Sequence, residues 1–273
     1  MPTLRLATAG RSPLHTALGE ARDWMVAAPA FPRSLLPPRR LLRMAVADGP
    51  RARSLVPSHP LVLVHGCIGN PTTWRPLVRR LHRRGLDAVY AFGYTSFGVD
   101  VPELAERLLT QVEQEFGQEP VHLVGHSLGG LIARYVTQEL AADTAVATLT
   151  TIATPNRGAG LARLLPTALG RDLRPDSPII RELASRPLPG ASVTTAYYTD
   201  RDLLVPQRSA TLCSPDAEDV AIPGFGHLSI LNAPRLADEL VSRLRHAERL
   251  TRAVPKRSAR PILRAVGGQP SLP

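Results

Sequence analysis

The residues with the clearest chemical meaning are Gly125, Ser127 and Gly129, which form a G-x-S-x-G pattern in the segment GHSLGG. The pattern follows the apolar run VHLVG and precedes an amphipathic stretch, so it predicts a sharp turn from a strand into a helix. Small residues beside the serine allow that turn, and the free N–H groups at the helix start favour a developing oxyanion. Ser127 is therefore predicted to be an activated nucleophile.

A serine hydroxyl attacks a carbonyl carbon only when a base takes its proton, and that base needs an orienting acid. His227, in GFGHLSI, and Asp202, in DRDLLVP, both follow Ser127 along the chain, each just after an expected strand. The glycines before the histidine favour a tight loop around it. Asp200 is the alternative acid, and Asp202 is preferred because the apolar run LLV follows it.

Attack on a carbonyl places negative charge on its oxygen, and stabilising that charge is usually the largest catalytic contribution. Two backbone N–H groups are expected to do so: one from Leu128, immediately after the nucleophile, and one from Cys67, in the segment HGCIGN. Gly66 should allow the backbone to approach the substrate closely. Cys67 as a nucleophile in its own right is the competing interpretation, but no second His/Asp set is evident.

Three aromatic residues follow predicted strand ends or begin helices, namely Trp74, Tyr94 and Phe97. Their position suits the wall of an acyl-binding site, and packing in the core is the equally weighted alternative. The substrate-binding prediction therefore names Gly66 and Trp74.

The elements that must position these residues begin at Leu61, where short apolar runs start to alternate with longer amphipathic stretches. Such alternation predicts an α/β fold with a mostly parallel central sheet and helices on both faces. Strands are expected at residues 61–65, 87–92, 121–125, 146–153, 192–199 and 219–222. Helices are expected at residues 72–84, 102–116, 128–140 and 234–246.

Residues 155–190 form a long insertion between two expected strands and are rich in leucine and isoleucine. Long connections of this kind often cover an active site, so the segment is predicted to be a short helical lid. An ordinary helical crossover with a packed apolar face is the alternative.

The segments LVLVHGCIGNPTTW, VHLVGHSLGG, ATPNRG, DRDLLVP and GFGH together resemble the α/β-hydrolase lipases and esterases, particularly small bacterial triacylglycerol lipases, over about residues 60–242. The resemblance implies the α/β-hydrolase fold and hydrolysis of carboxylic esters through an acyl-enzyme, without a cofactor. Some relatives hold a structural calcium ion, but the sequence matches no ligand set for one, so no metal site is expected. The order Ser127, Asp202, His227 is that of this family. The single His-Gly of the oxyanion loop resembles lipases that act on medium or long acyl chains.

The chain has 273 residues and a formal net charge of +10, all of which lies in its two ends. Residues 1–53 carry nine arginines against three acidic residues, and residues 243–273 carry eight basic residues against one. We expect a basic Pro/Arg-rich extension at residues 1–55, a catalytic domain at 56–248 and a basic flexible tail at 249–273.

The basic flanks suit peripheral contact with an anionic membrane surface, with solvated mobile arms as the alternative. Specific binding of nucleic acid is not expected, because neither flank interleaves aromatic residues with its arginines or carries a recognition motif. The expected partner is instead a small acyl ester or lipid.

Cysteine usage and apolar runs point to the cytoplasm. Cys67 and Cys213 lie far apart and lack metal-ligand spacing, which predicts neither a disulfide framework nor a zinc site. The apolar stretch 24–31 is too short and too far from the start for a signal peptide, and no apolar run is long enough to span a membrane.

A serine ester hydrolase acting on lipid-like acyl esters is the leading interpretation. A thioesterase or an acyltransferase could use the same three side chains with a different leaving group or acceptor. A catalytically silent fold that acts as a binding protein is the alternative from another class.

Overall fold

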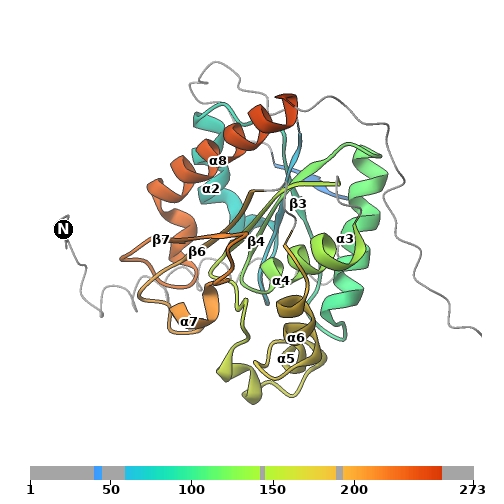
Figure 1. Ribbon diagram of the computed structural model, residues 1–273, viewed down its shortest axis with the longest axis vertical. Helices are drawn as coiled ribbons and strands as arrows, with labels where there is room; N and C mark the ends of the chain where they lie inside the picture. The colour runs from blue at the N-terminus through green and yellow to red at the C-terminus, as the bar shows by residue number, and fades with distance from the viewer. Residues whose placement is uncertain (1–39, 45–58, 142–144, 189–192, 254–273) are drawn as a thin grey trace, which may run out of the picture.

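The computed structural model describes residues 40–44, 59–141, 145–188 and 193–253 (Figure 1). Its centre is a seven-stranded sheet with the strand order β1-β3-β2-β4-β5-β6-β7. All neighbouring strands run parallel except β1, which pairs antiparallel with β3. The strands are β1 (Leu42–Arg43), β2 (Leu61–Val64), β3 (Val89–Phe92), β4 (Val121–His126), β5 (Val146–Ile152), β6 (Val193–Tyr198) and β7 (Glu218–Ala221).

The prediction of a mostly parallel sheet is confirmed, and each of the six predicted strands corresponds to one of β2 to β7. The strand β1 was not anticipated. It lies within the extension predicted at residues 1–55 and pairs through Leu42 with Ala91 of β3. A strand of two residues is too short to show a hydrophobic pattern in the sequence, so only its pairing with β3 reveals this edge strand.

Helices cover both faces of the sheet, as expected (Figure 1). On one face, α2 and α8 pack over an apolar layer that includes Leu77, Leu81 and Leu240. On the other face, α3 and α4 pack over a second layer with Leu104 and Leu131. The helical segments are η2 (Pro71–Trp74), α2 (Arg75–Arg83), α3 (Val101–Phe116), α4 (Leu128–Tyr135), η3 (Val136–Leu140), η4 (Gly160–Leu164), α5 (Ala168–Asp172), α6 (Pro178–Ser185), α7 (Gln207–Ala210), η5 (Ser229–Asn232) and α8 (Pro234–Ala253).

Local sequence explains where these helices begin and end. The Asp100 carboxylate caps α3 by accepting a hydrogen bond from the N–H of Glu103, and the helix ends at Gly117, whose φ of 62° is left-handed. The helix predicted at residues 128–140 is α-helical to Tyr135 and then widens into the π-turn η3. Helix α8 extends into the predicted tail and ends at Ala253, two residues before Pro255.

The predicted insertion forms a cap, which we define as residues 153–188. It contains η4, α5 and α6 and lies beyond the ends of the strands, next to α4 (Figure 1). Leu169, Ile180 and Leu183 are buried in the same apolar layer as α3 and α4, whereas Leu161 and Leu164 are exposed. The cap is therefore lid-like in position but has a firmly packed inner face, so both expectations for this segment describe part of it.

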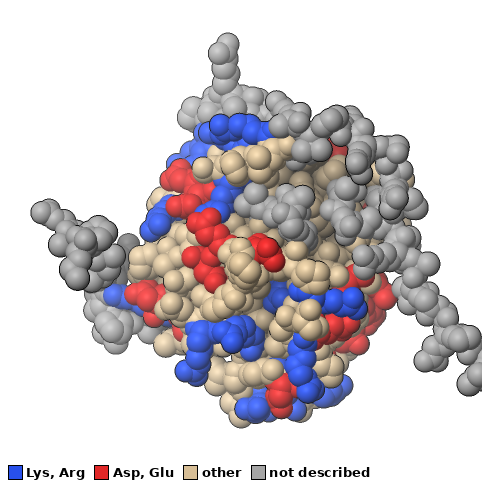
Figure 2. Space-filling view, in the orientation of Figure 1, with Lys and Arg blue, Asp and Glu red and all other residues tan. Residues whose placement is uncertain are grey.

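The cap is also basic, with six arginines against three acidic residues. In the space-filling view, blue Lys and Arg side chains gather on the part of the surface where the cap lies (Figure 2). Within the described residues, no helix is both long and apolar enough to cross a membrane. Residues 1–39 and 254–273, on which the prediction of membrane contact mainly rests, lie outside the described part of the chain.

Candidate active site

The candidate site lies where the strands end. Ser127 directly follows β4, the segment His65–Cys67 follows β2, and the loops after β6 and β7 carry Asp202 and His227. Parallel strands place all their carboxyl ends at one edge of the sheet, so residues far apart in the sequence meet there. The sheet topology thus brings together the three side chains that the sequence singled out.

The turn at Ser127 is held in a conformation that leaves no room for larger neighbours. Ser127 has φ 54° and ψ −123°, a region that non-glycine residues rarely occupy. A Cβ at Gly125 would lie 2.3 Å from the carbonyl oxygen of Gly129, and a Cβ at Gly129 would lie 2.0 Å from that of Val64. The glycines of the motif are therefore required by backbone packing, as the predicted sharp turn implies.

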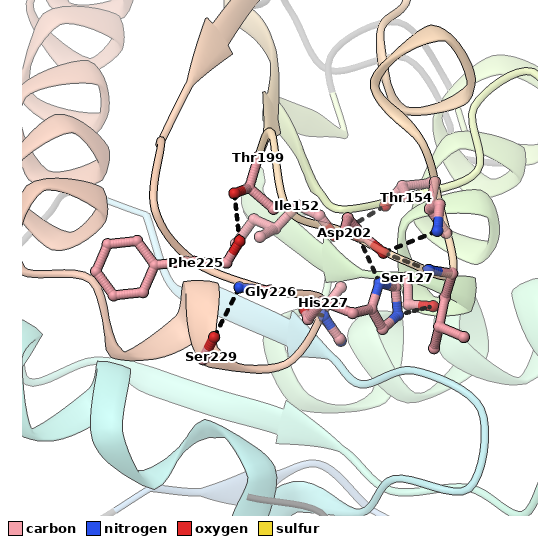
Figure 3. Close-up of polar contacts among 12 residues, drawn as sticks. Ser127, Ile152, Thr154, Thr199, Asp202, Phe225, Gly226, His227 and Ser229 are labelled. Atoms are coloured by element: carbon pink, nitrogen blue, oxygen red, sulfur yellow. Dashed lines mark hydrogen bonds and ion pairs between the residues drawn. The ribbon is translucent and has the colours of Figure 1, made fainter. Parts of the chain in front are cut away.

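Ser127, His227 and Asp202 form one chain of hydrogen bonds (Figure 3). The Ser127 hydroxyl lies 3.0 Å from Nε2 of His227, and Nδ1 of His227 lies 2.7 Å from Oδ2 of Asp202. The imidazole can therefore accept the serine proton at Nε2 while Nδ1–H donates to the carboxylate. The side chains of His227 and Asp202 are 6% and 1% exposed, so the acid–base pair is largely shielded from water.

The geometry separates Asp202 from its alternative, Asp200. The second oxygen of Asp202 accepts hydrogen bonds from the N–H groups of Leu204 and Val205, at 2.9 and 2.8 Å, which fixes the carboxylate. Asp200 instead accepts from the N–H of Gly224 at 2.8 Å. Asp200 thus holds the loop that carries the histidine, and Asp202 holds the imidazole itself.

The loop of His227 is fixed by several further contacts, two of which Figure 3 shows. The Thr199 hydroxyl donates to the carbonyl of Phe225 at 2.5 Å, and the N–H of Gly226 donates to the Ser229 hydroxyl at 2.8 Å. The Nε2–H of His126 donates to the carbonyl of His227 itself at 2.8 Å. Burial, with a smaller contribution from His227, lowers the pKa of His126 to about 3, so its ring is neutral and acts as a hydrogen-bond donor.

The predicted oxyanion loop lies against the nucleophile turn. A Cβ at Gly66 would lie 3.0 Å from the Cβ of Ser127, so only glycine lets the two backbones approach this closely. Cys67 follows it, and Leu128 begins α4 with its N–H free for a ligand by position. Burial raises the pKa of the Cys67 thiol, which keeps it protonated and makes it a poor nucleophile.

The three predicted aromatic residues have separate environments. Trp74 has no exposed surface and packs in the apolar layer of α2 and α8, with its ring edge towards His126 at a centroid distance of 6.4 Å. Such a buried side chain offers support beneath the site rather than a surface for substrate. Phe97 is 58% exposed, and Tyr94 is buried against the oxyanion loop.

The structure also reveals a residue that sequence reasoning missed. Arg134 on α4 is only 3% exposed and donates to the carbonyls of Asn156 and Leu183, at 2.9 and 2.8 Å. These acceptors lie near the start and the end of the cap, so one guanidinium ties both to the helix that follows the nucleophile. The signal was an arginine in the otherwise apolar run LGGLIARYV. Burial lowers the pKa of Arg134 to about 10, which leaves it charged at neutral pH.

This arrangement can activate a hydroxyl, hold an imidazolium beside a buried carboxylate and present backbone N–H groups near the attacking oxygen. Those three capacities together serve acyl transfer through a covalent intermediate. Chemistry of this kind occurs on several unrelated folds.

Two curated relatives carry the name triacylglycerol lipase, one from Pseudarthrobacter phenanthrenivorans and one from Burkholderia plantarii. Each is 31% identical to this chain over 180 residues, a match that covers 62% of the chain. The matched segment spans only 55% and 49% of the two relatives, so the chain covers about half of their length.

Among solved structures, the mature form of the Bacillus licheniformis lipase BlEst2 matches with a TM-score of 0.55 at 17% identity, over 72% of this chain and 96% of that one. This likeness concerns the fold. A family model described as the alpha/beta hydrolase family matches residues 61–266, which is most of the chain. The order of the strands in the sheet and the helices on both of its faces agree with this match. The chain therefore belongs to the alpha/beta hydrolase family, with relatives of the lipase and esterase type.

Proposed function

We propose that the protein hydrolyses carboxylic esters with lipid-like acyl chains, using Ser127 as the nucleophile, His227 as the general base and acid, and Asp202 to orient the imidazole. The observation that carries the proposal is the hydrogen-bond chain from Ser127 Oγ to Asp202 Oδ2, at 3.0 and 2.7 Å. The names of the two curated relatives support the choice of lipid esters.

In the first half of the reaction, Ser127 Oγ attacks the ester carbonyl carbon while its proton passes to Nε2 of His227. The carbonyl oxygen becomes an oxyanion, which the N–H groups of Cys67 and Leu128 stabilise. Collapse of this intermediate breaks the bond to the alkoxy group, which takes the proton from His227 and leaves as the alcohol. The acyl group is then bound to Ser127.

In the second half, water attacks the acyl-enzyme and gives its proton to His227 Nε2. The resulting oxyanion collapses, the proton returns to Ser127 Oγ, and the carboxylic acid leaves. Throughout, Asp202 accepts the hydrogen bond of Nδ1–H, which fixes the tautomer and stabilises the transient imidazolium. His126 keeps the His227 backbone in place through its bond to the carbonyl.

The test is hydrolysis of p-nitrophenyl esters over a series of acyl lengths by the wild type and by Ser127→Ala, with Ser185→Ala as the control. Ser185 is an exposed serine at the end of α6 whose hydroxyl donates to the Glu182 carbonyl. We expect Ser127→Ala to lose nearly all activity and Ser185→Ala to retain it. Medium or long acyl chains should be preferred.

Labelling with a fluorophosphonate separates the alternatives. A protein that labels at Ser127 but hydrolyses only thioesters, with a thiol as the leaving group, would be a thioesterase. One that labels at Ser127 but passes the acyl group to an alcohol or a thiol instead of water would be an acyltransferase. A protein that neither labels nor hydrolyses any ester would overturn the proposal in favour of a binding role.

A further inference from the structure

We propose that Tyr94, which follows β3, is a positioning residue that fixes the oxyanion loop through His65. The inference rests on the proposed function, because a rigid oxyanion loop matters only if an acyl carbonyl is attacked beside it. It assigns the phenol a role beyond the two expected for it, the wall of an acyl site or general core packing.

Three contacts join Tyr94 to His65. The Tyr94 hydroxyl donates to the backbone carbonyl of His65 at 2.6 Å, and the backbone N–H of Tyr94 points to Nε2 of the His65 ring at 3.5 Å. The two rings stack with a centroid distance of 4.1 Å and an interplanar angle of 4°. Both residues are buried, at 3% and 0% exposure. The phenol therefore points at one peptide of the loop rather than at an open acyl site.

The protonation states make these contacts consistent with one another. Burial lowers the pKa of His65 to about 4, so the ring is neutral at physiological pH. Its Nδ1 lies 2.8 Å from the carbonyl of Gly66, which can only accept, so the proton is on Nδ1 and Nε2 is free to accept from Tyr94. Burial also keeps the Tyr94 hydroxyl protonated, because it raises the pKa of the phenol well above 10.

The peptide held in this way is enclosed on its other side by the nucleophile turn. A Cβ at Gly129 would lie 2.4 Å from the His65 carbonyl oxygen, the same atom that accepts from Tyr94. Gly66 in turn approaches Ser127 closely. The segment His65–Cys67 is thus clamped between Tyr94 and the turn, and the direction of the Cys67 N–H follows from that clamp.

A loop that presents an oxyanion donor affects the transition state more than the ground state, because the negative charge exists only after attack. Loss of a complete oxyanion donor costs about 10²–10³-fold in kcat, and a donor displaced by less than 1 Å costs less. Removing the Tyr94 hydroxyl should therefore lower kcat by about tenfold to a hundredfold and change KM by less than about twofold.

The variant is Tyr94→Phe, which keeps the ring and its stacking on His65 but removes the hydroxyl. The matched control is Tyr90→Phe on β3, because Tyr90 lies in the same apolar layer but its ring packs against Phe116, at the end of α3, with a centroid distance of 4.9 Å. Turnover is divided by the number of Ser127 sites that a fluorophosphonate labels at completion, so a partly folded preparation does not lower kcat artificially.

We expect Tyr94→Phe to lower kcat and to slow fluorophosphonate labelling, because the transition state of labelling also places negative charge on an oxygen, the phosphoryl oxygen of the probe, beside the same loop. The shape of the pH profile should not change, and Tyr90→Phe should match the wild type. The proposal is overturned if Tyr94→Phe retains kcat within twofold, or if the loss appears in KM together with a changed acyl-length preference. If Ser127→Ala retained activity, the proposed function would fail instead, which distinguishes the two.

Discussion

The nucleophile turn and the cap both adjoin helix α4, but the outer part of the cap is much more loosely packed than the turn. The turn is fixed by backbone pressed against backbone: a Cβ at Gly125 or Gly129 would lie within 2.4 Å of a neighbouring backbone atom. The inner part of the cap is also tight, since a Cβ at Gly158 or Gly170 would lie 2.4 or 2.2 Å from a backbone atom. On its outer part, however, a Cβ at Gly160 would meet nothing within 4 Å, and Leu164 is 77% exposed. A position where backbone packs against backbone tolerates almost no substitution, whereas an exposed position in a surface loop tolerates many.

The residues proposed to react lie in the nucleophile turn and in the loops of Asp202 and His227, which together we call the fixed region. There Asp202 and His227 have several hydrogen bonds each and little exposure. The cap depends on its packed leucines and on the Arg134 bonds to Asn156 and Leu183. A protein can change which substrates it admits by altering the second region while leaving the first intact.

The largest effect should come from removing one charge in the fixed region. Asp202→Asn should lower kcat by about 10⁴-fold, because an amide in place of the carboxylate no longer stabilises the imidazolium and favours the wrong tautomer of His227. Asp200→Asn is the matched control, two residues away. It should cost about tenfold or less, since it only weakens the bond to the Gly224 N–H.

Both variants are measured by steady-state hydrolysis of one p-nitrophenyl ester, with circular dichroism to verify folding. Equal losses of kcat, or a larger loss for Asp200→Asn, would contradict the assignment of Asp202 as the acid that orients His227.

The next effect concerns the backbone contacts themselves. Gly129→Ala should lower the free energy of unfolding by about 3 kcal/mol or more, because the new Cβ would lie 2.0 Å from the carbonyl oxygen of Val64, which belongs to a central strand and cannot move aside. Gly160→Ala in the cap should change stability by less than about 1 kcal/mol, in the stabilising direction, since it restricts the unfolded chain.

Urea denaturation of both variants measures this difference. If Gly129→Ala unfolded at the wild-type urea concentration, the turn would be less tightly packed than its contacts indicate, and the contrast with the cap would not hold.

The sequence predicted most of the fixed region because its signals are local. The positions of strands β2 to β7 along the chain follow from the alternation of short apolar runs with longer amphipathic ones, and the glycines around Ser127 are near one another in the chain. The preference for Asp202 over Asp200 rested only on the apolar run that follows it, and the folded chain places the Asp202 carboxylate against the His227 imidazole. In each case the pattern and the physical constraint occupy the same few residues.

The contacts that sequence reasoning missed are long-range. Tyr94 bonds to His65, 29 positions away, and Arg134 bonds to Leu183, 49 positions away. A tyrosine after a strand or an arginine in a helix has many ordinary roles, so neither residue type predicts its partner. Trp74 shows the converse, since its position after a strand end suggested a substrate contact and the folded chain buries it completely. Only tertiary structure decides such cases.

The smallest of the three effects concerns the attachment of the cap. Arg134→Met should lower the free energy of unfolding by about 2 kcal/mol, because the carbonyl of Asn156 loses its Arg134 donor inside the protein and that of Leu183 keeps only the longer bond from Gln138, at 3.1 Å. Arg163→Met is the control within the cap itself. Arg163 pairs with Asp176 at 3.3 Å, but its side chain is 61% exposed, so the loss should stay below about 0.5 kcal/mol.

Limited proteolysis adds a readout specific to the cap. Arg134→Met should be cut sooner than the wild type within residues 153–188, while kcat for a short acyl ester, which needs only the fixed region, should change by less than about threefold. If the variant lost the short-ester activity as completely as Asp202→Asn, Arg134 would hold the nucleophile helix itself, and the cap and the turn would form a single mechanical unit.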